Sequence, residues 1–132
     1  MFLSHFTCPN LLQILNAIAY LDEHGRTNTA DAVKIARTQM FTASNGDRSG
    51  DDNIMIVITD GYSNVLSQNT IPEATTAKNN GIRLITVGLG QGANRGELEA
   101  MASNPVSENT HYLENESQLE TVAGQILDRL CQ

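Results

Sequence analysis

The chain has 132 residues, a length that fits a single domain. Its 15 acidic and 8 basic residues give a net charge of −7, so its long-range field would repel a nucleic-acid backbone. No segment approaches the roughly 18 apolar residues that a membrane span needs. The first residues, MFLSHFTCPN, lack the basic region and the long apolar stretch of a signal peptide. Composition therefore indicates a globular domain with no nucleic-acid partner and no membrane span.

The first part of the chain predicts a strand end and two helices. Residues 2–6 have the character of the end of a strand. A helix is expected over 9–21, because its apolar residues recur at helical spacing and Pro9 suits the first helical position. A polar loop follows at 22–28, and a second helix is expected over 29–41.

Three apolar runs then predict strands. The continuous run at 54–58 is typical of a central parallel strand covered on both faces. Asp60 and Gly61 follow directly after its carboxyl end. A second buried strand is expected over 82–90 and a short third strand over 110–114.

Helices are expected between and after these strands. One follows Ile71 and stops at Gly81, and a short one precedes the third strand. The last covers 117–131 and begins with a predicted capping box of Ser117 and Glu120. Strands joined by helices form a parallel sheet with helices on both sides, and ligands bind beyond the carboxyl ends of its strands.

Four stretches carry a resemblance to a known family: GRTNTADAV at 25–33, IMIVITDGYS at 54–63, GIRLITVGLG at 81–90 and the closing ILDRLC. With them the chain resembles a von Willebrand factor type A (vWA) domain, also called an integrin I domain, over nearly its whole length. The separation between Thr27 and Asp60 fits that family's spacing. The resemblance implies a three-layer α/β/α fold with a doubly wound, mostly parallel sheet.

The resemblance also implies a metal-ion-dependent adhesion site at the carboxyl end of the sheet. Thr27 and Asp60 match the threonine and the aspartate that two of its loops supply. The ion would be Mg²⁺, or Mn²⁺ or Ca²⁺, and a carboxylate of a protein partner would complete its shell. Mg²⁺ prefers about six hard oxygen ligands, and few charged ligands leave it attractive to an incoming carboxylate. Such a site binds a ligand, so we do not expect an enzyme.

One family motif is missing from the sequence. No D-x-S-x-S occurs, and the matching region would precede residue 1. Residues 1–132 are therefore expected to be a single partial vWA domain, its C-terminal two-thirds to three-quarters, without the first central strand, first helix and second strand. The metal site would be incomplete, with cation binding weak or absent in this chain. The open edge of strand 54–58 would favour marginal stability or self-association.

The individual site residues also have simpler interpretations. Asp60 could only hold the turn after its strand. Thr27 and Thr29 could each cap the following helix; Thr27 is the candidate ligand and Thr29 the candidate cap. Ser63 is expected to be a turn residue.

Two covalent sites are candidates. Cys8 and Cys131 form no CxxC motif, and from the sequence alone they are either free thiols or a tie between the domain ends. The resemblance implies that Cys131 pairs with a cysteine before the first strand, for which Cys8 would be a poor substitute. Asn115 lies in the glycosylation sequon NES, which matters only if the protein is secreted.

The resemblance implies a secreted adhesion module of the extracellular-matrix type, whose partner would be collagen or another matrix protein. The alternative is an intracellular vWA scaffold in a multiprotein complex, without metal dependence. A disulfide at Cys131 or a glycan on Asn115 would favour the first. An enzyme that uses Asp60 as nucleophile or metal ligand is a third interpretation, but no second carboxylate or lysine stands at a recognisable spacing.

Overall fold

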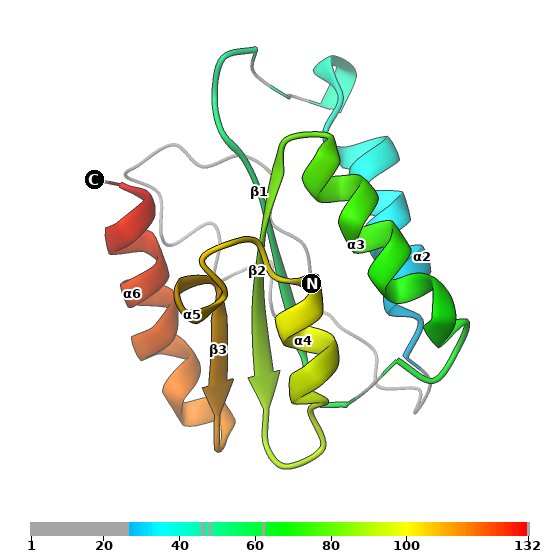
Figure 1. Cartoon of the computed structure of the whole chain (residues 1–132). Coiled ribbons are helices and arrows are strands. Elements are labelled where there is room, and N and C mark those ends of the chain that lie inside the picture. Colours follow the sequence, from blue (N-terminus) through cyan, green and yellow to red (C-terminus); the bar gives the residue numbers. More distant parts are fainter. Residues whose placement is uncertain (1–26, 46, 48, 62, 132) are drawn as a thin grey trace.

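A computed structural model describes residues 27–131 with the exception of 46, 48 and 62 (Figure 1). Its centre is a sheet of three parallel strands, β1 (Asn53–Thr59), β2 (Ile82–Leu89) and β3 (Thr110–Leu113), in the order β1-β2-β3. The register places Thr59 opposite Gly88, so that β1 and β2 end at the same level. The expected parallel sheet is confirmed, whereas the elements expected at 2–6 and 9–21 lie outside the described residues.

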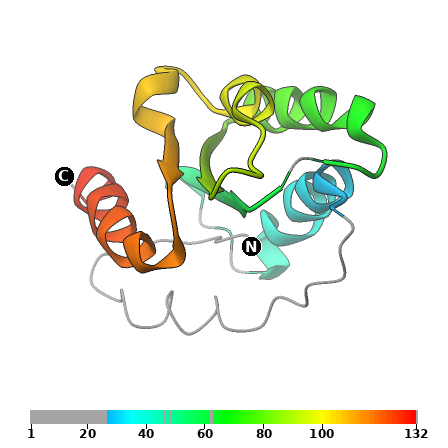
Figure 2. The same cartoon turned by 90° about the horizontal axis from the view of Figure 1, so that it is seen from below.

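Helices cover both faces of this sheet (Figure 2). They are α2 (Thr29–Ile35), α3 (Thr70–Asn79), α4 (Arg95–Met101), α5 (Val106–Asn109) and α6 (Leu119–Leu130). The α6 helix lies on the opposite side of the sheet from α2 and α3 (Figures 1 and 2). The α/β architecture predicted from the alternation of helices and strands is therefore correct.

Alternating side chains of the strands form two separate apolar clusters, one on each face of the sheet. The first cluster lies between the sheet and α2, α3 and α4, and comprises Val33, Ala36, Met55, Val57, Ala74, Ala77, Ile82, Leu84 and Met101. The second lies under α6, and comprises Ile54, Ile56, Ile85, Val87, Leu113 and Ile126. Both clusters draw on β1 and β2, which explains why each strand reads as a continuous apolar run.

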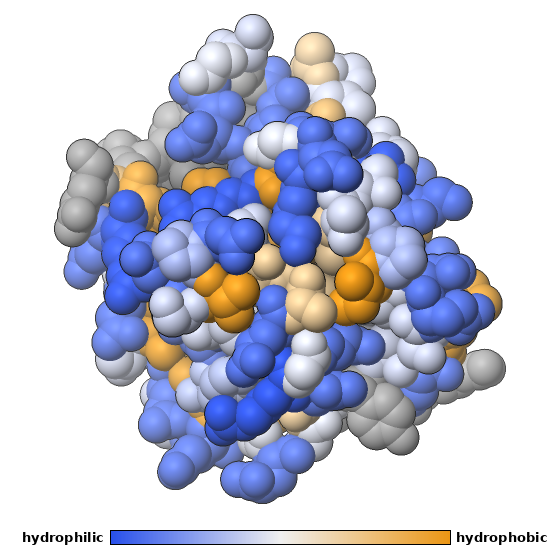
Figure 3. All heavy atoms as spheres, viewed as in Figure 1, coloured by the Kyte–Doolittle hydropathy of each residue, from blue (hydrophilic) through white to orange (hydrophobic). Residues whose placement is uncertain are grey.

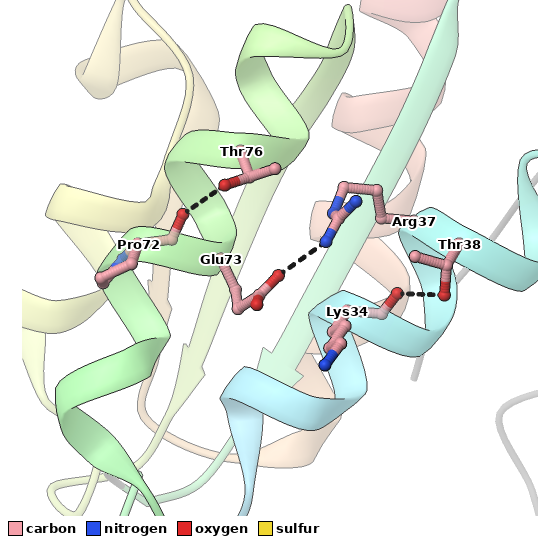
Figure 4. Close-up of polar contacts among 6 residues, drawn as sticks. All are labelled: Lys34, Arg37, Thr38, Pro72, Glu73 and Thr76. Carbon is pink, nitrogen blue, oxygen red and sulfur yellow. Dashed lines mark hydrogen bonds and ion pairs between the residues drawn. The ribbon is translucent and has the colours of Figure 1, made fainter.

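An ion pair connects two helices of the first face (Figure 4). Arg37 Nη2 lies 2.9 Å from Glu73 Oε2, and the two side chains are only 16% and 24% exposed. Within their own helices, Thr38 Oγ1 donates to the carbonyl of Lys34 and Thr76 Oγ1 to that of Pro72. The ion pair therefore ties the turns after α2 to α3 across 36 positions of sequence.

The helix expected over 29–41 differs from the prediction at both ends. Its N-cap is Asn28, whose Oδ1 accepts the Asp31 N–H at 3.1 Å, and Thr29 is the buried first helical residue. The prediction of Thr29 as cap was therefore wrong, because asparagine is an equally good cap one residue earlier. Beyond α2, Ala36–Met40 form a π-helical stretch that ends with a bond from the Phe41 N–H to the Ala36 carbonyl.

The start of the last helix also differs from the prediction. Glu116–Gln118 form a 3₁₀ turn, and α6 begins at Leu119 without a side-chain cap. Asn115 caps the 3₁₀ turn instead, with its Oδ1 accepting the Ser117 N–H at 3.1 Å. The predicted capping box of Ser117 and Glu120 was wrong, because the extended Asn115 accepts the Ser117 N–H that the Glu120 side chain would have had to reach.

Two features lie around the second and third strands. Gly81 follows the C-cap of α3 with a φ of +80°, as the predicted stop requires. The short α5 was not predicted, since four residues are too few to show helical periodicity. Its buried Asn109 donates to the carbonyls of Ser103 and Pro105, and accepts a hydrogen bond from Arg83 Nε at 2.9 Å.

The surface seen in the view of Figure 1 is mainly hydrophilic, with small and separated apolar spots (Figure 3). Over the described residues, none of the helices combines the length and the apolar character that crossing a membrane requires.

Candidate functional site

Asp60 follows β1 directly and is exposed at the carboxyl end of the sheet. Within the described part of the chain, its carboxylate takes part in no hydrogen bond or ion pair. The turn after the strand is held by Thr59 instead: the Gly61 N–H donates to Thr59 Oγ1 at 3.2 Å, and that hydroxyl lies 3.3 Å from the Gly61 carbonyl. Thr59 therefore holds the turn, which is the role that the simpler interpretation gave to Asp60. The Asp60 carboxylate remains available to a ligand.

The Thr27 hydroxyl lies beside this same turn. A Cβ built on Gly61 would be 3.9 Å from Thr27 Oγ1, so the two predicted ligand loops meet at the end of β1. Backbone contacts fix the approach: the Thr27 N–H donates to Asn64 Oδ1 at 2.9 Å, and the Asn64 and Val65 N–H groups donate to the Thr27 carbonyl at 3.0 and 3.1 Å. The hydroxyl itself has no hydrogen-bond partner among the described residues.

The segment between β2 and α4 also packs against the turn. Gly92 lies so close to Asp60 that a Cβ at residue 92 would be 2.5 Å from the Asp60 carbonyl oxygen. Only glycine allows such an approach of two backbones. From α4, Glu97 Oε1 accepts the Ser63 N–H at 3.0 Å. Three chain segments therefore converge on one end of the sheet: the segment at Thr27, the loop after β1, and the segment from Gly92 to Glu97.

Sequence reasoning missed Asn64, Glu97 and the role of Gly92. Asn64 and Thr27 are 37 positions apart, and Glu97 and Ser63 are 34 positions apart. No periodicity or local motif connects residues at such separations. Ser63, expected to be a turn residue, is 3% exposed, and its hydroxyl lies 3.5 Å from the carbonyls of Thr27 and Val65.

Leu66, in the same loop, has an unusual backbone and an exposed side chain. Its φ is +50° and its side chain is 47% exposed. A residue other than glycine in this region costs about 1–3 kcal/mol, and such strain concentrates at ligand-binding sites. The loop therefore exposes an apolar side chain at the residue after Val65, whose N–H donates to the Thr27 carbonyl.

The donors present fit a hard divalent cation in kind. A hydroxyl and a carboxylate are oxygen ligands of the type that Mg²⁺ prefers. Their number is too small for a full shell, and the described residues contain no cluster of three or more His, Cys, Asp or Glu side chains that could hold an ion. The remaining ligands would have to be waters, a partner's carboxylate or residues outside the described ones.

The two covalent candidates lie at the end of the chain. Cys131 is disulfide-bonded, and the described residues contain no other cysteine. Asn115 is exposed two residues after the end of β3, at the same end of the sheet as Asp60. Its Oδ1 accepts hydrogen bonds from both the N–H and the hydroxyl of Ser117.

Comparison with known proteins identifies the family. The family model of the von Willebrand factor type A domain matches residues 2–125. The chain belongs to this family. The resemblance that the sequence motifs carry is thereby confirmed.

The relatives of this vWA chain include integrins, collagen VI chains and matrilins. Integrin alpha-M of Mus musculus is 32% identical over 114 residues, which cover 81% of this chain and 10% of the integrin. Collagen alpha-5(VI) chain of Homo sapiens is 38% identical over 112 residues, covering 83% of this chain and 4% of the collagen. Matrilin-1 of Bos taurus is 34% identical, covering 80% and 19%. The chain therefore spans less than a quarter of each of these relatives.

Solved structures show the same fold. Proximal thread matrix protein 1 from the mussel byssus superimposes with a TM-score of 0.76 at 27% identity, covering 91% of this chain and 31% of that one. A second structure of that protein has a zinc-occupied metal-ion-dependent adhesion site (MIDAS) motif, with a TM-score of 0.75 at 28% identity. BatB from Bacteroides thetaiotaomicron, at 18% identity and a TM-score of 0.57, shows a likeness of fold alone.

Proposed function

We propose that this vWA chain is an adhesion module of the extracellular-matrix type. It binds a protein ligand, such as collagen or another matrix protein, through the loops at the carboxyl end of its sheet. In the complete domain, a divalent cation held in part by Thr27 and Asp60 attracts a carboxylate of that ligand. The observation that carries the proposal is the position of the Thr27 hydroxyl beside Gly61, the residue that follows Asp60, whose exposed carboxylate has no hydrogen bond or ion pair among the described residues.

The chemistry of the two residues supports this role. Asp60 supplies one negative charge and Thr27 a neutral oxygen, so a bound cation would keep most of its positive charge for an incoming acidic side chain. Mg²⁺ retains several waters when it binds to proteins, and a ligand carboxylate can replace one of them. The chain's own residues orient the ion and leave one side open.

An extracellular location is part of the proposal. The disulfide at Cys131 favours an oxidising compartment. The relatives include matrilins and collagen VI chains. Asn115, exposed within its sequon, is the proposed glycosylation site; a loss of mass on enzymatic deglycosylation of the secreted chain, absent in Asn115→Gln, would identify it. A chain with a reduced Cys131 and no glycan would favour the intracellular scaffold.

Substitution of Asp60 tests the proposed function. The full chain is applied to immobilised collagen and other matrix proteins in Mg²⁺ and in EDTA, and Asp60→Ala is compared with Asp128→Ala, a change at an exposed aspartate of α6. We expect Asp60→Ala and EDTA each to weaken adhesion at least about tenfold, since even groups that only support a metal ligand contribute 10–100-fold. Asp128→Ala should bind normally.

The opposite result has a clear meaning. Adhesion that is equal in Mg²⁺ and EDTA, and equal in Asp60→Ala and the unsubstituted chain, would exclude the cation mechanism. Circular dichroism of each variant shows whether the fold is kept, so that a loss of adhesion can be assigned to the site.

A further inference from the structure

The start of α4 contains a carboxylate in an unexpected contact. The sequence Asn94-x-x-Glu97 has the pattern of a capping box, and Asn94 Oδ1 accepts the Glu97 N–H at 3.2 Å as that motif requires. In a full capping box the Glu97 side chain would return to the Asn94 N–H. Here Glu97 Oε1 instead accepts the Ser63 N–H at 3.0 Å, in the loop that follows Asp60.

Ser63 makes this contact structurally important. The residue is 3% exposed, so its backbone N–H has little access to water and needs an acceptor within the protein. A carboxylate is a stronger acceptor than a neutral group. Glu97 is thus the group that satisfies the loop at its most buried residue.

A short series of hydrogen bonds leads from this contact to Thr27. The two residues after Ser63, Asn64 and Val65, both donate their N–H groups to the Thr27 carbonyl, and Asn64 Oδ1 accepts the Thr27 N–H. The Ser63 hydroxyl also lies 3.5 Å from that carbonyl. A displacement of Ser63 would therefore displace the backbone that carries the Thr27 hydroxyl.

The same part of the molecule touches Asp60. Gly92, which precedes α4, is in close backbone contact with the Asp60 carbonyl. One unit, formed by the start of α4 and the residues before it, therefore contacts the loop after β1 at both Asp60 and Ser63, and that loop in turn bonds to Thr27.

We propose that Glu97 is a positioning residue for the Thr27–Asp60 site. Its carboxylate holds the loop of residues 63–65, and through that loop it sets the place of the Thr27 hydroxyl relative to Asp60. This inference rests on the proposed function for its biological meaning, but the positioning itself is a property of the chain that can be measured without a cation.

Three variants separate the effect of the acceptor oxygen from that of the charge and from that of a nearby glutamate. Glu97→Ala removes the acceptor. Glu97→Gln removes the charge and keeps an acceptor oxygen. Glu99→Ala is the matched control, because Glu99 lies on the same helix but accepts from the Tyr112 hydroxyl, away from the loop.

The first measurement is amide hydrogen exchange by NMR in the full chain without added metal. We expect Glu97→Ala to accelerate exchange at Ser63 and Thr27 about tenfold, the size expected for a lost hydrogen bond to a charged group. Glu97→Gln should have a smaller effect, and Glu99→Ala none. The Val57 amide in β1 reports global unfolding. Equal acceleration at Val57, or none at Thr27, would overturn the proposal.

The second measurement is the affinity for Mg²⁺ by calorimetry, with adhesion to collagen alongside it. We expect Glu97→Ala to lower the affinity about tenfold, Glu97→Gln to restore most of it, and Glu99→Ala to leave it unchanged. Full affinity in Glu97→Ala, where Asp60→Ala has lost it, would refute the positioning role and leave the proposed function standing. If the unsubstituted chain shows no cation-dependent adhesion, the proposed function fails, and the exchange data still decide whether Glu97 positions the loop.

Discussion

The two faces of the sheet are covered in different ways. On the face of α2, α3 and α4, small residues are completely buried: Ala36, Ala74 and Ala77 each have 0% exposure. On the other face, α6 buries Ile126 to 5% exposure, whereas Leu119, Val122 and Leu130 remain only partly buried. The first face is therefore packed closely through small side chains, and the second is covered more loosely through large ones.

This difference shows where the chain concentrates its stability. Small residues allow helices to approach the sheet and each other, and the ion pair between Arg37 and Glu73 adds a tie on the same face. On the second face, the end of α6 is held by apolar contacts and by the disulfide of the adjacent Cys131. We therefore expect the first face to define the global free energy of unfolding and α6 to be the more separable element.

The largest effect should come from a cavity in the first face. Leu84→Ala would empty a completely buried site in β2, and such changes cost about 2–5 kcal/mol of unfolding free energy. Ile126→Ala on α6 should cost less, towards the lower end of that range, because a half-covered helix can relax into the space. Chemical denaturation followed by circular dichroism gives both values. Equal losses would contradict the proposed difference between the faces.

The tie between helices of the first face should contribute next. Arg37→Ala would leave the carboxylate of Glu73, only 24% exposed, without its partner, and we expect a loss of about 1.5–3 kcal/mol. Lys34→Ala is the control, because Lys34 is an exposed cation in α2, one turn before Arg37. An Arg37→Ala variant as stable as this control would show that the ion pair contributes no measurable free energy of unfolding.

A pH effect should test the second face, and we expect it to be the smallest. His111 on β3 has a buried Nε2 without a hydrogen bond to any described group. Burial, and then the positive charge of Arg129 on α6, lower the pKa of His111, while a hydrogen bond with the backbone of Glu108 opposes them. The folded protein therefore disfavours the protonated ring.

The direction in which stability changes with pH follows from this lowered pKa. Above pH 6.5 the ring is neutral in both states and its contribution to stability is complete. As the pH falls below 6.5, the unfolded chain takes up the proton first, and stability is lost until the pH has passed the lowered pKa of His111 in the folded state. Unfolding measured between pH 7.5 and pH 5 should show a smaller loss in His111→Gln than in the unsubstituted chain. Identical pH profiles of the variant and the unsubstituted chain would show that His111 does not contribute to the pH dependence of stability.

Much of the fold could be predicted from the sequence, because the signals were local and strong. The apolar runs of β1 and β2 and the periodicity of α6 each reflect burial that a short stretch of residues records. Apart from the unpredicted α5, the errors lay at helix ends. There several neighbouring residues could serve as caps. Only the backbone geometry shows that Asn28 and Asn115 are the ones that do so.

The candidate site could be predicted only in part. Thr27 and Asp60 came from the family resemblance, and the meeting of their loops is seen in the approach of the Thr27 hydroxyl to Gly61. That Thr59 rather than Asp60 holds the turn, and that Glu97 reaches Ser63, could not be read from the sequence. Such contacts depend on side-chain directions across loops, for which no periodic pattern exists.

Gly92 limits how this chain can diverge. Because any side chain there would collide with the Asp60 carbonyl, a missense change at this codon would separate the two loops at the binding end while both apolar clusters stayed intact. Residue 92 carries no functional group, yet its replacement would look to a geneticist like the loss of one. Genetic variation would thus reveal a constraint that comes from the lack of room for a side chain at residue 92.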